Sequence, residues 1–349
     1  MDILDNQNIL EQRDSEKTLD SAVKQPEQIS IPLEIVHAPS EVRPITKVIV
    51  SGMGGSALAA LQIKTWLAPR IKLPFEVFRS YGLPAYADES TLVIASSCSG
   101  NTEETLSAYE AALSVGAQVA VVEKGGKLLE DAKHDGVAHV ELPNLPIQPR
   151  MLTIAQLKAL TQLLIAYKLV DESALDELTE ACQWLEQFVP LWQKTTPHSD
   201  NVAKQMAVDA AGKTAVFFGG PYMAAAAYKW KISWNENAKN TAFWNEYPEF
   251  NHNEFMGWSS HPVEKPFAIY DIVSDLELPR IRQRFELSDR LLSGKRPKAT
   301  VIQPEGDTVL KQLLWVSLLA DFTSIYLGIL NNVDPGPVPL IEKFKKELG

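Results

Sequence analysis

The sequence predicts an α/β protein with two subdomains, each built on a parallel sheet flanked by helices in a doubly wound arrangement. Short runs rich in Val and Ile recur along the chain, and helical patterns alternate with them. The order strand, glycine turn, helix occurs in both halves, and 349 residues exceed the usual size of one domain. Strands that alternate with helices indicate βαβ units whose sheet is buried on both faces.

The first 150 residues are expected to form an arm and the first sheet. Residues 1–24 are acidic and polar, without an apolar run of signal-peptide type, and indicate an N-terminal arm. Residues 25–150 form the first subdomain. Its strands are expected at 47–52, 75–80, 91–97, 117–123 and 137–143.

The rest of the chain is expected to form a helical linker and a second sheet. In residues 151–199 apolar side chains recur every three and four positions, which predicts linker helices. The second subdomain covers residues 200–349, with strands expected at 214–220, 266–273 and 299–306. The apolar run 313–330 has Asp321 at its middle and predicts a buried core helix, not a membrane span.

Composition excludes several classes of function. The apolar fraction of 45% and charged fraction of 22% are typical of a soluble globular protein. A net charge of -11 argues against nucleic acid as a partner, because phosphate backbones are bound by surplus Lys and Arg. Cys98 and Cys182 lie far apart, which favours a reducing cytoplasm. His134 and His139 form no metal-site spacing, so no metal is expected.

Two turns have the composition of an anion site. Gly54, Gly55 and Ser56 follow the strand 47–52 and open a helix, where backbone amides and the helix dipole favour an anion. The same glycines also satisfy the weak dinucleotide pattern G-x-G-x-x-A.

The second turn, after the strand 91–97, carries Ser97, Ser99, Asn101 and Thr102. Hydroxyls and amides can satisfy the oxygens of a phosphate monoester without cationic side chains. One N-cap needs one such residue, whereas four crowd this turn.

These motifs resemble a known family. GMGGSA followed by SSCSGNTEET resembles the sugar isomerase (SIS) domain. WNENAK, EFNHNEFMGW, VDPGPV and KFKKEL resemble the bacterial and archaeal bifunctional phosphoglucose/phosphomannose isomerases, from about residue 25 to the C-terminus. The resemblance implies two SIS-type subdomains, the first of which holds the substrate phosphate.

The resemblance also implies roles for four side chains and needs no cofactor. Glu236 is implied as the base that moves a proton between C2 and C1, and Arg150 as the group that stabilises the enediolate. His252 is implied in ring opening, donated to the neighbouring active site of a homodimer. Lys345 is its implied partner, although Lys343 and Lys346 lie close to it in the sequence.

The expected function is therefore a cytoplasmic aldose–ketose isomerase. It would interconvert glucose 6-phosphate and fructose 6-phosphate, and also mannose 6-phosphate and fructose 6-phosphate, by a metal-free proton transfer through a cis-enediol. The first alternative is a non-catalytic sugar-phosphate sensor, although the sequence has no helix-turn-helix segment. The second is an NADP-dependent enzyme, because Arg79 ends the second strand, where a 2'-phosphate could bind.

Overall fold

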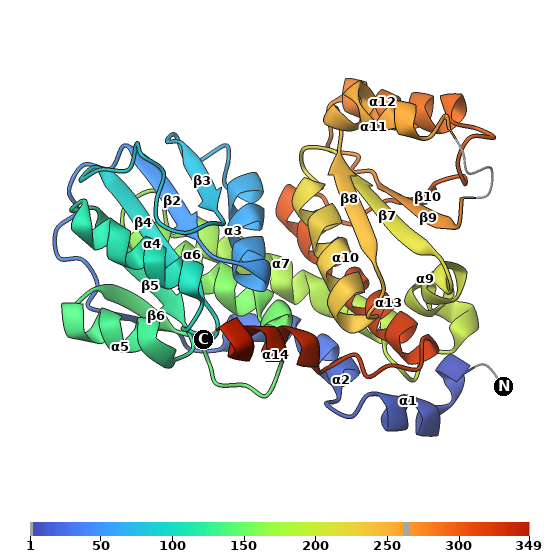
Figure 1. The fold of residues 1–349 in the computed structure, drawn as a ribbon, viewed down its shortest axis with the longest axis horizontal. Coiled ribbons are helices and arrows are strands. Elements are labelled where there is room, and N and C mark those ends of the chain that lie inside the picture. Colours follow the sequence, from blue (N-terminus) through green and yellow to red (C-terminus); the bar gives the residue numbers. More distant parts are fainter. Residues whose placement is uncertain (1–2, 261–264, 349) are drawn as a thin grey trace. The chain divides into compact units, whose positions relative to one another are not determined.

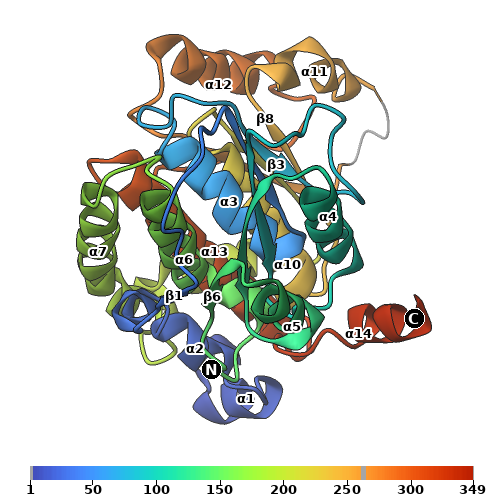
Figure 2. The same cartoon turned by 90° about the vertical axis from the view of Figure 1, so that its left-hand side faces the viewer.

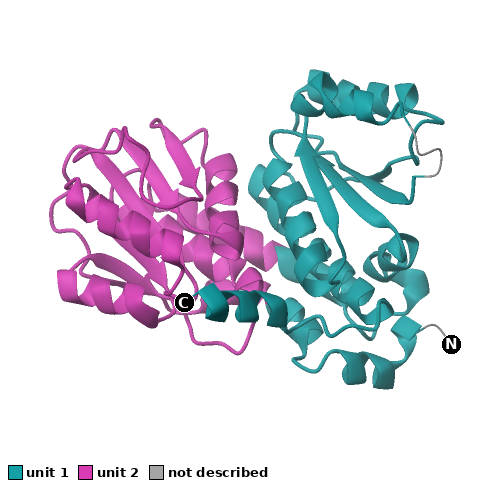
Figure 3. Cartoon of the chain, viewed as in Figure 1, with its two compact units in different colours: residues 1–24, 185–349 teal, residues 25–184 magenta. Residues whose placement is uncertain are grey.

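The computed structural model describes residues 3–260 and 265–348, which form two compact units (Figure 3). The first unit comprises residues 25–184, and the second comprises residues 1–24 with 185–349. Residues 1–24 thus pack with the second unit, where the Arg13 guanidinium donates to the Ile329 carbonyl at 2.6 Å. The expected linker 151–199 is divided between the units, because its first helices belong to the first one.

The first unit holds a six-stranded sheet in the order β1-β6-β5-β4-β2-β3 (Figure 1). All neighbours are parallel except β1, which is antiparallel to β6. The strands are β1 (Ile35–Val36), β2 (Lys47–Ser51), β3 (Phe75–Phe78), β4 (Thr91–Ser97), β5 (Gln118–Glu123) and β6 (Ala138–Glu141). Every residue of β4 and β5 is buried, as expected for the central strands of a covered sheet.

Helices cover both faces of this sheet (Figures 1 and 2). They are α3 (Gly54–Trp66), α4 (Glu103–Ser114), α5 (Gly126–Asp135), α6 (Thr153–Ala166) and α7 (Ser173–Leu185), with short 3-10 turns η2 (Pro26–Ser30) and η3 (Pro149–Met151). On one face Tyr109 of α4 and Leu128 of α5 join the core formed by Val93 and Val121. The helices α3 and α6 pack against each other on the other face.

The second unit holds a four-stranded parallel sheet in the order β10-β9-β7-β8. The strands are β7 (Thr214–Gly219), β8 (Ala242–Glu246), β9 (Phe267–Ile272) and β10 (Thr300–Ile302). The helices are α1 (Gln7–Arg13), α2 (Thr18–Val23), α8 (Val189–Trp192), α9 (Val202–Ala210), α10 (Ala224–Asn237), α11 (Glu254–Gly257), α12 (Pro279–Leu291), α13 (Val309–Leu330) and α14 (Pro339–Leu348), and the 3-10 turns are η1 (Ile3–Asp5), η4 (Glu186–Phe188), η5 (His198–Asp200) and η6 (Glu249–His252).

The helix α13 forms the core of the second unit. Among the described residues it alone is long and apolar enough to cross a membrane, but 94% of its most apolar window is buried inside the protein. Asp321, at its middle, accepts hydrogen bonds from Lys229 at 2.6 Å and Ser233 at 2.8 Å, both on α10. A buried carboxylate with such partners is typical of a protein core, as the sequence predicted.

All eight expected strands are present, and two further strands were not expected. β1 has only two residues, too few to produce a periodic signal. β8 lies in the aromatic and amide-rich segment 234–258, which has no alternating apolar pattern. Because β8 is an edge strand, it pairs on one side only and needs no continuous apolar run. Trp234 in the same segment is fully buried, and its ring lies 5.2 Å from that of Phe217.

Candidate functional site

Two turns of the first unit meet at the carboxyl edge of its sheet, where the neighbouring strands β2 and β4 end. A Cβ on Gly52 would lie 2.8 Å from the Ser96 carbonyl oxygen, so only glycine lets the turns approach this closely. The Ser56 hydroxyl, in the first turn of α3, accepts a hydrogen bond from the Cys98 amide at 3.2 Å. This edge is where open α/β sheets bind ligands.

Three hydroxyls converge in the turn that follows β4. The Oγ of Ser97 lies 2.8 Å from Thr102 Oγ1, and Ser99 Oγ lies 3.4 Å from the same atom. The Gly100 amide donates to Ser97 Oγ at 3.1 Å. Thr102 precedes α4, yet within the described chain its side chain makes no capping hydrogen bond. Capping of α4 therefore does not explain this cluster of hydroxyls.

The same turn is fixed to the start of α5. The side-chain oxygen of Asn101 accepts from the Lys127 amide, and the Gly100 carbonyl accepts from the Leu128 amide, both at 2.9 Å. Gly100 has φ +67°, and a Cβ there would overlap the Gly125 carbonyl oxygen. Asn101 thus fixes the turn through its side chain, while the hydroxyls of the neighbouring residues bond to one another.

Arg150 lies at the same edge of the first unit. It belongs to η3, and a Cβ on Gly55 would lie 3.1 Å from its Cα atom. The Arg150 side chain is buried, and its Nη1 lies 3.4 Å from Gln148 Oε1. The first unit thus brings Gly55, Ser56 and the hydroxyls after β4 together with the backbone of Arg150.

Glu236 lies near the end of α10 in the second unit. It lines a pocket of about 760 Å³ together with Lys239, Phe243 and the segment 338–341 at the start of α14. Its backbone carbonyl accepts from Lys239 Nζ at 2.7 Å. This pocket has a mostly apolar wall beside one carboxylate, which is typical of a small-molecule site.

His252 and Lys345 do not line the pocket that contains Glu236. His252 is exposed at the end of η6, and Lys345 is exposed on α14. Within the second unit, therefore, the implied ring-opening pair is not assembled beside the implied base.

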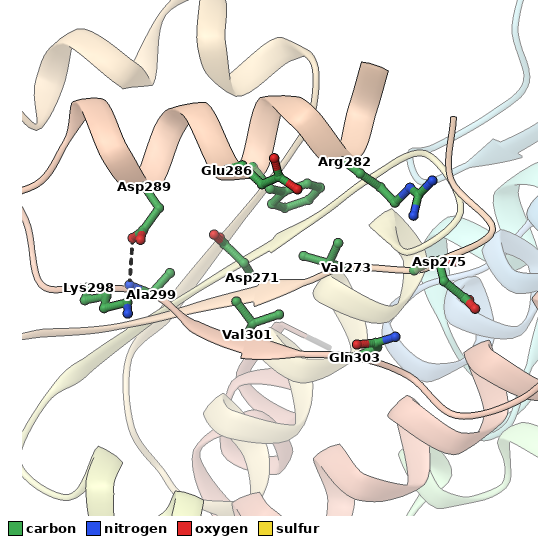
Figure 4. A pocket seen from close by; sticks show the side chains of 12 residues that line it. Asp271, Val273, Asp275, Arg282, Glu286, Asp289, Lys298, Ala299, Val301 and Gln303 are labelled. Carbon is green, nitrogen blue, oxygen red and sulfur yellow. Dashed lines mark hydrogen bonds between the residues drawn. The ribbon is translucent and has the colours of Figure 1, made fainter. Parts of the chain in front are cut away.

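A different pocket of the second unit was not predicted from the sequence (Figure 4). It has a volume of about 440 Å³ and lies among α12, β9 and the segment that contains β10. None of the described residues that line this pocket was predicted as a site residue from the sequence. Burial raises the pKa of its Asp271 to about 7, against the opposing effect of Arg296, whose Nη2 lies 4.0 Å away. An aspartate inside the apolar run FAIYDIV is the sequence signal for this buried carboxyl.

The turn after β7 in the second unit contains a carboxylate of its own. The Glu277 carboxylate accepts a hydrogen bond from the Tyr222 amide at 2.6 Å, just before α10. A Cβ on Gly220 would overlap that carboxylate. A carboxyl group of the protein itself thus contacts the turn whose counterpart in the first unit is a candidate site for an external anion.

Curated relatives match this chain over most of its length. A bifunctional phosphoglucose/phosphomannose isomerase of Caldicellulosiruptor bescii is 32% identical over 94% of this chain and 98% of its own. The chain belongs to this isomerase family. A second family member, from Aquifex aeolicus, is also 32% identical, over 88% of this chain and 92% of its own.

Two further comparisons agree with the family. Residues 199–348 match the family profile described as the bacterial phospho-glucose isomerase C-terminal SIS domain. A solved structure of a glucose-6-phosphate isomerase like protein from Thermus thermophilus superposes with a TM-score of 0.66, covering 99% of each chain at 18% identity. At that identity the likeness shows the fold, which is the expected pair of SIS-type sheets.

Proposed function

We propose that this chain is an aldose–ketose isomerase that interconverts glucose 6-phosphate and fructose 6-phosphate, and mannose 6-phosphate and fructose 6-phosphate. The observation that carries the proposal is the cluster of Ser97, Ser99 and Thr102 hydroxyls at the carboxyl edge of the first sheet. In a member of the phosphoglucose/phosphomannose isomerase family, a phosphorylated hexose is the ligand that suits this cluster.

The phosphate group is held by two turns in this proposal. Three hydroxyls and the first amides of α3 and α4 supply donors to its oxygens, and Gly54, Gly55 and Ser56 supply the first of these turns. The positive ends of both helices favour the dianion despite the net charge of -11.

The chemistry requires a base, an electrostatic partner and a ring-opening pair. Glu236 carries the proton between C2 and C1, and Arg150 stabilises the enediolate. His252 of the partner subunit and Lys345 open the ring, so the enzyme acts as a homodimer. This route passes through a cis-enediol and uses no metal or redox cofactor. We place the reaction in the cytoplasm, where buried free thiols such as Cys98 and Cys182 stay reduced.

The test is an isomerase assay with two substrates in parallel. Purified protein is given fructose 6-phosphate, and glucose 6-phosphate and mannose 6-phosphate are followed separately with coupled enzymes. We expect turnover to both products. A well-folded dimer that forms neither aldose at saturating fructose 6-phosphate contradicts the proposal, and formation of one aldose alone restricts its substrate range.

A further inference from the structure

A buried carboxyl lies next to the phosphate turn on the neighbouring strand. Glu123 is the last residue of β5, and in the parallel register it pairs with Ser97 of β4. Adjacent strands are about 4.8 Å apart, and residues paired in register point to the same face. Glu123 is fully buried, and neither of its carboxyl oxygens has a hydrogen-bond partner among the described residues.

The backbone connects Glu123 to the turn by a second route. The residues after Glu123 lead into α5, and the start of α5 is hydrogen-bonded to the turn after β4. The Lys127 amide donates to the Asn101 side chain, and the Leu128 amide donates to the Gly100 carbonyl. The hydroxyls and Glu123 thus belong to one packed element. A charge on Glu123 would act on a phosphate held by the turn after β4 through space, and also through the packing of that turn against the start of α5.

The surroundings of Glu123 favour its neutral form. Burial raises the pKa of its carboxyl to about 8, and Glu141 of β6 adds to this effect. The positive charge of Lys133 on α5 opposes it. From α4 the phenol of Tyr109 donates to Asp135 at 2.8 Å, and the thiol of Cys98 follows Ser97 in the turn itself.

We propose that Glu123 is a positioning residue of the phosphate site, and that it must be uncharged for the turn after β4 to hold a phosphate dianion. The inference rests on the proposed phosphate site and adds a proton requirement to it. An ionised Glu123 would place a like charge beside the dianion in a poorly solvated part of the protein, where repulsion is strong. The sugar phosphate therefore binds the protein with Glu123 protonated, and the affinity for the sugar phosphate falls as Glu123 ionises.

The test measures the affinity for fructose 6-phosphate by calorimetry between about pH 7.5 and 9.5, where the phosphate ester, with a second pKa near 6, stays a dianion. If the bound dianion raises the pKa of Glu123 by one unit, wild-type affinity falls about sixfold over this range, and a larger shift gives a larger fall. Glu123→Gln is neutral at every pH, so we expect it to bind like wild type at the lower pH and to keep that affinity at the higher one.

Two further variants control for other charges. Glu110→Gln removes an exposed carboxylate from α4 and should follow the wild-type curve. Glu141→Gln removes a charge that opposes ionisation of Glu123, so its affinity should fall at lower pH than that of wild type. A decline that persists unchanged in Glu123→Gln would assign the titration to another group, such as Cys98, and would overturn the inference.

A second measurement needs no variant. Near pH 8 wild-type protein should take up a fraction of a proton on binding fructose 6-phosphate, seen as a binding enthalpy that depends on the ionisation enthalpy of the buffer. Zero uptake overturns the role of Glu123 and leaves the proposed isomerase standing. Absence of any binding at pH 7.5 overturns the phosphate site itself, and with it both proposals.

Discussion

At the scale of single residues, the hydroxyls predicted to bind phosphate and the predicted base Glu236 have different surroundings in the structure. The hydroxyls of Ser97, Ser99 and Thr102, which we propose bind the phosphate, contact one another, so their positions follow from one turn. Glu236 instead lies in a separate pocket with an apolar wall. Its role as a base remains a proposal that depends on chemistry, and one substitution tests it.

Glu236→Gln should keep substrate binding and lose turnover. The amide preserves the shape of the side chain but cannot accept the C2 proton, and general-base catalysis contributes about 10² to 10⁴-fold in rate. We expect kcat to fall by a factor in that range while the affinity for fructose 6-phosphate, measured by calorimetry, stays near wild type. Glu246→Gln, on the exposed end of β8, is the matched control and should leave kcat unchanged. A fully active Glu236→Gln would rule out the assignment.

At the scale of elements, the close approach of two glycine turns shapes the proposed phosphate site. Gly100 combines a positive φ with a contact that leaves no room for a Cβ. Gly100 contacts the segment that joins β5 to α5, so the conformation of the turn after β4 depends on the position of α5. In the second unit Glu277 closes the turn after β7, which is why we assign only the first unit a phosphate.

Gly100→Ala should weaken both folding and ligand binding. The left-handed conformation costs a non-glycine residue about 1 to 2 kcal/mol, and the overlap with Gly125 adds to that cost. Gly116→Ala is the matched control, because Gly116 has φ +71° but its nearest neighbour would lie 4.0 Å away. We expect urea unfolding to show a larger loss for Gly100→Ala, and fructose 6-phosphate affinity to fall only in that variant. Equal losses in both variants would show that the contact is unimportant.

At the scale of the whole molecule, the proposed homodimer makes a prediction about pairs of chains. If the partner subunit donates His252, then Glu236 and His252 of one chain serve different active sites. The exposure of His252, and its absence from the wall of the Glu236 pocket, are compatible with this division. The arrangement can be tested by mixing two inactive variants.

Glu236→Gln and His252→Ala should complement each other. In a mixed dimer one active site carries both substitutions and the other carries neither. Random mixing at equal amounts makes half of the dimers mixed, so about a quarter of wild-type activity should return after subunit exchange. The measurement is the isomerase assay before and after exchange, with each variant alone treated in the same way. No recovery from a mixture that does form mixed dimers would place Glu236 and His252 of one chain in the same site.

Much of the fold could be predicted from local sequence patterns. All eight expected strands are present, because central strands such as β4 and β5 must be apolar along their whole length. β8 was not expected, since an edge strand carries no such requirement. The composition of segment 234–258 is explained by several environments in succession: Trp234 is in the core, Phe243 is exposed, and the Asn245 amide donates to Glu254 at 2.8 Å.

The sequence by itself determined the parallel strands of the two sheets, the buried character of α13 and the two turns that could hold a phosphate. These follow from residue types and short spacings, which act within one strand, turn or helix. Only the tertiary structure decided that the hydroxyls after β4 are fixed against the start of α5, that Glu277 closes the turn after β7, and that Glu123 is buried beside Ser97. Those relations join residues distant in sequence, and strand register and helix packing alone bring them together.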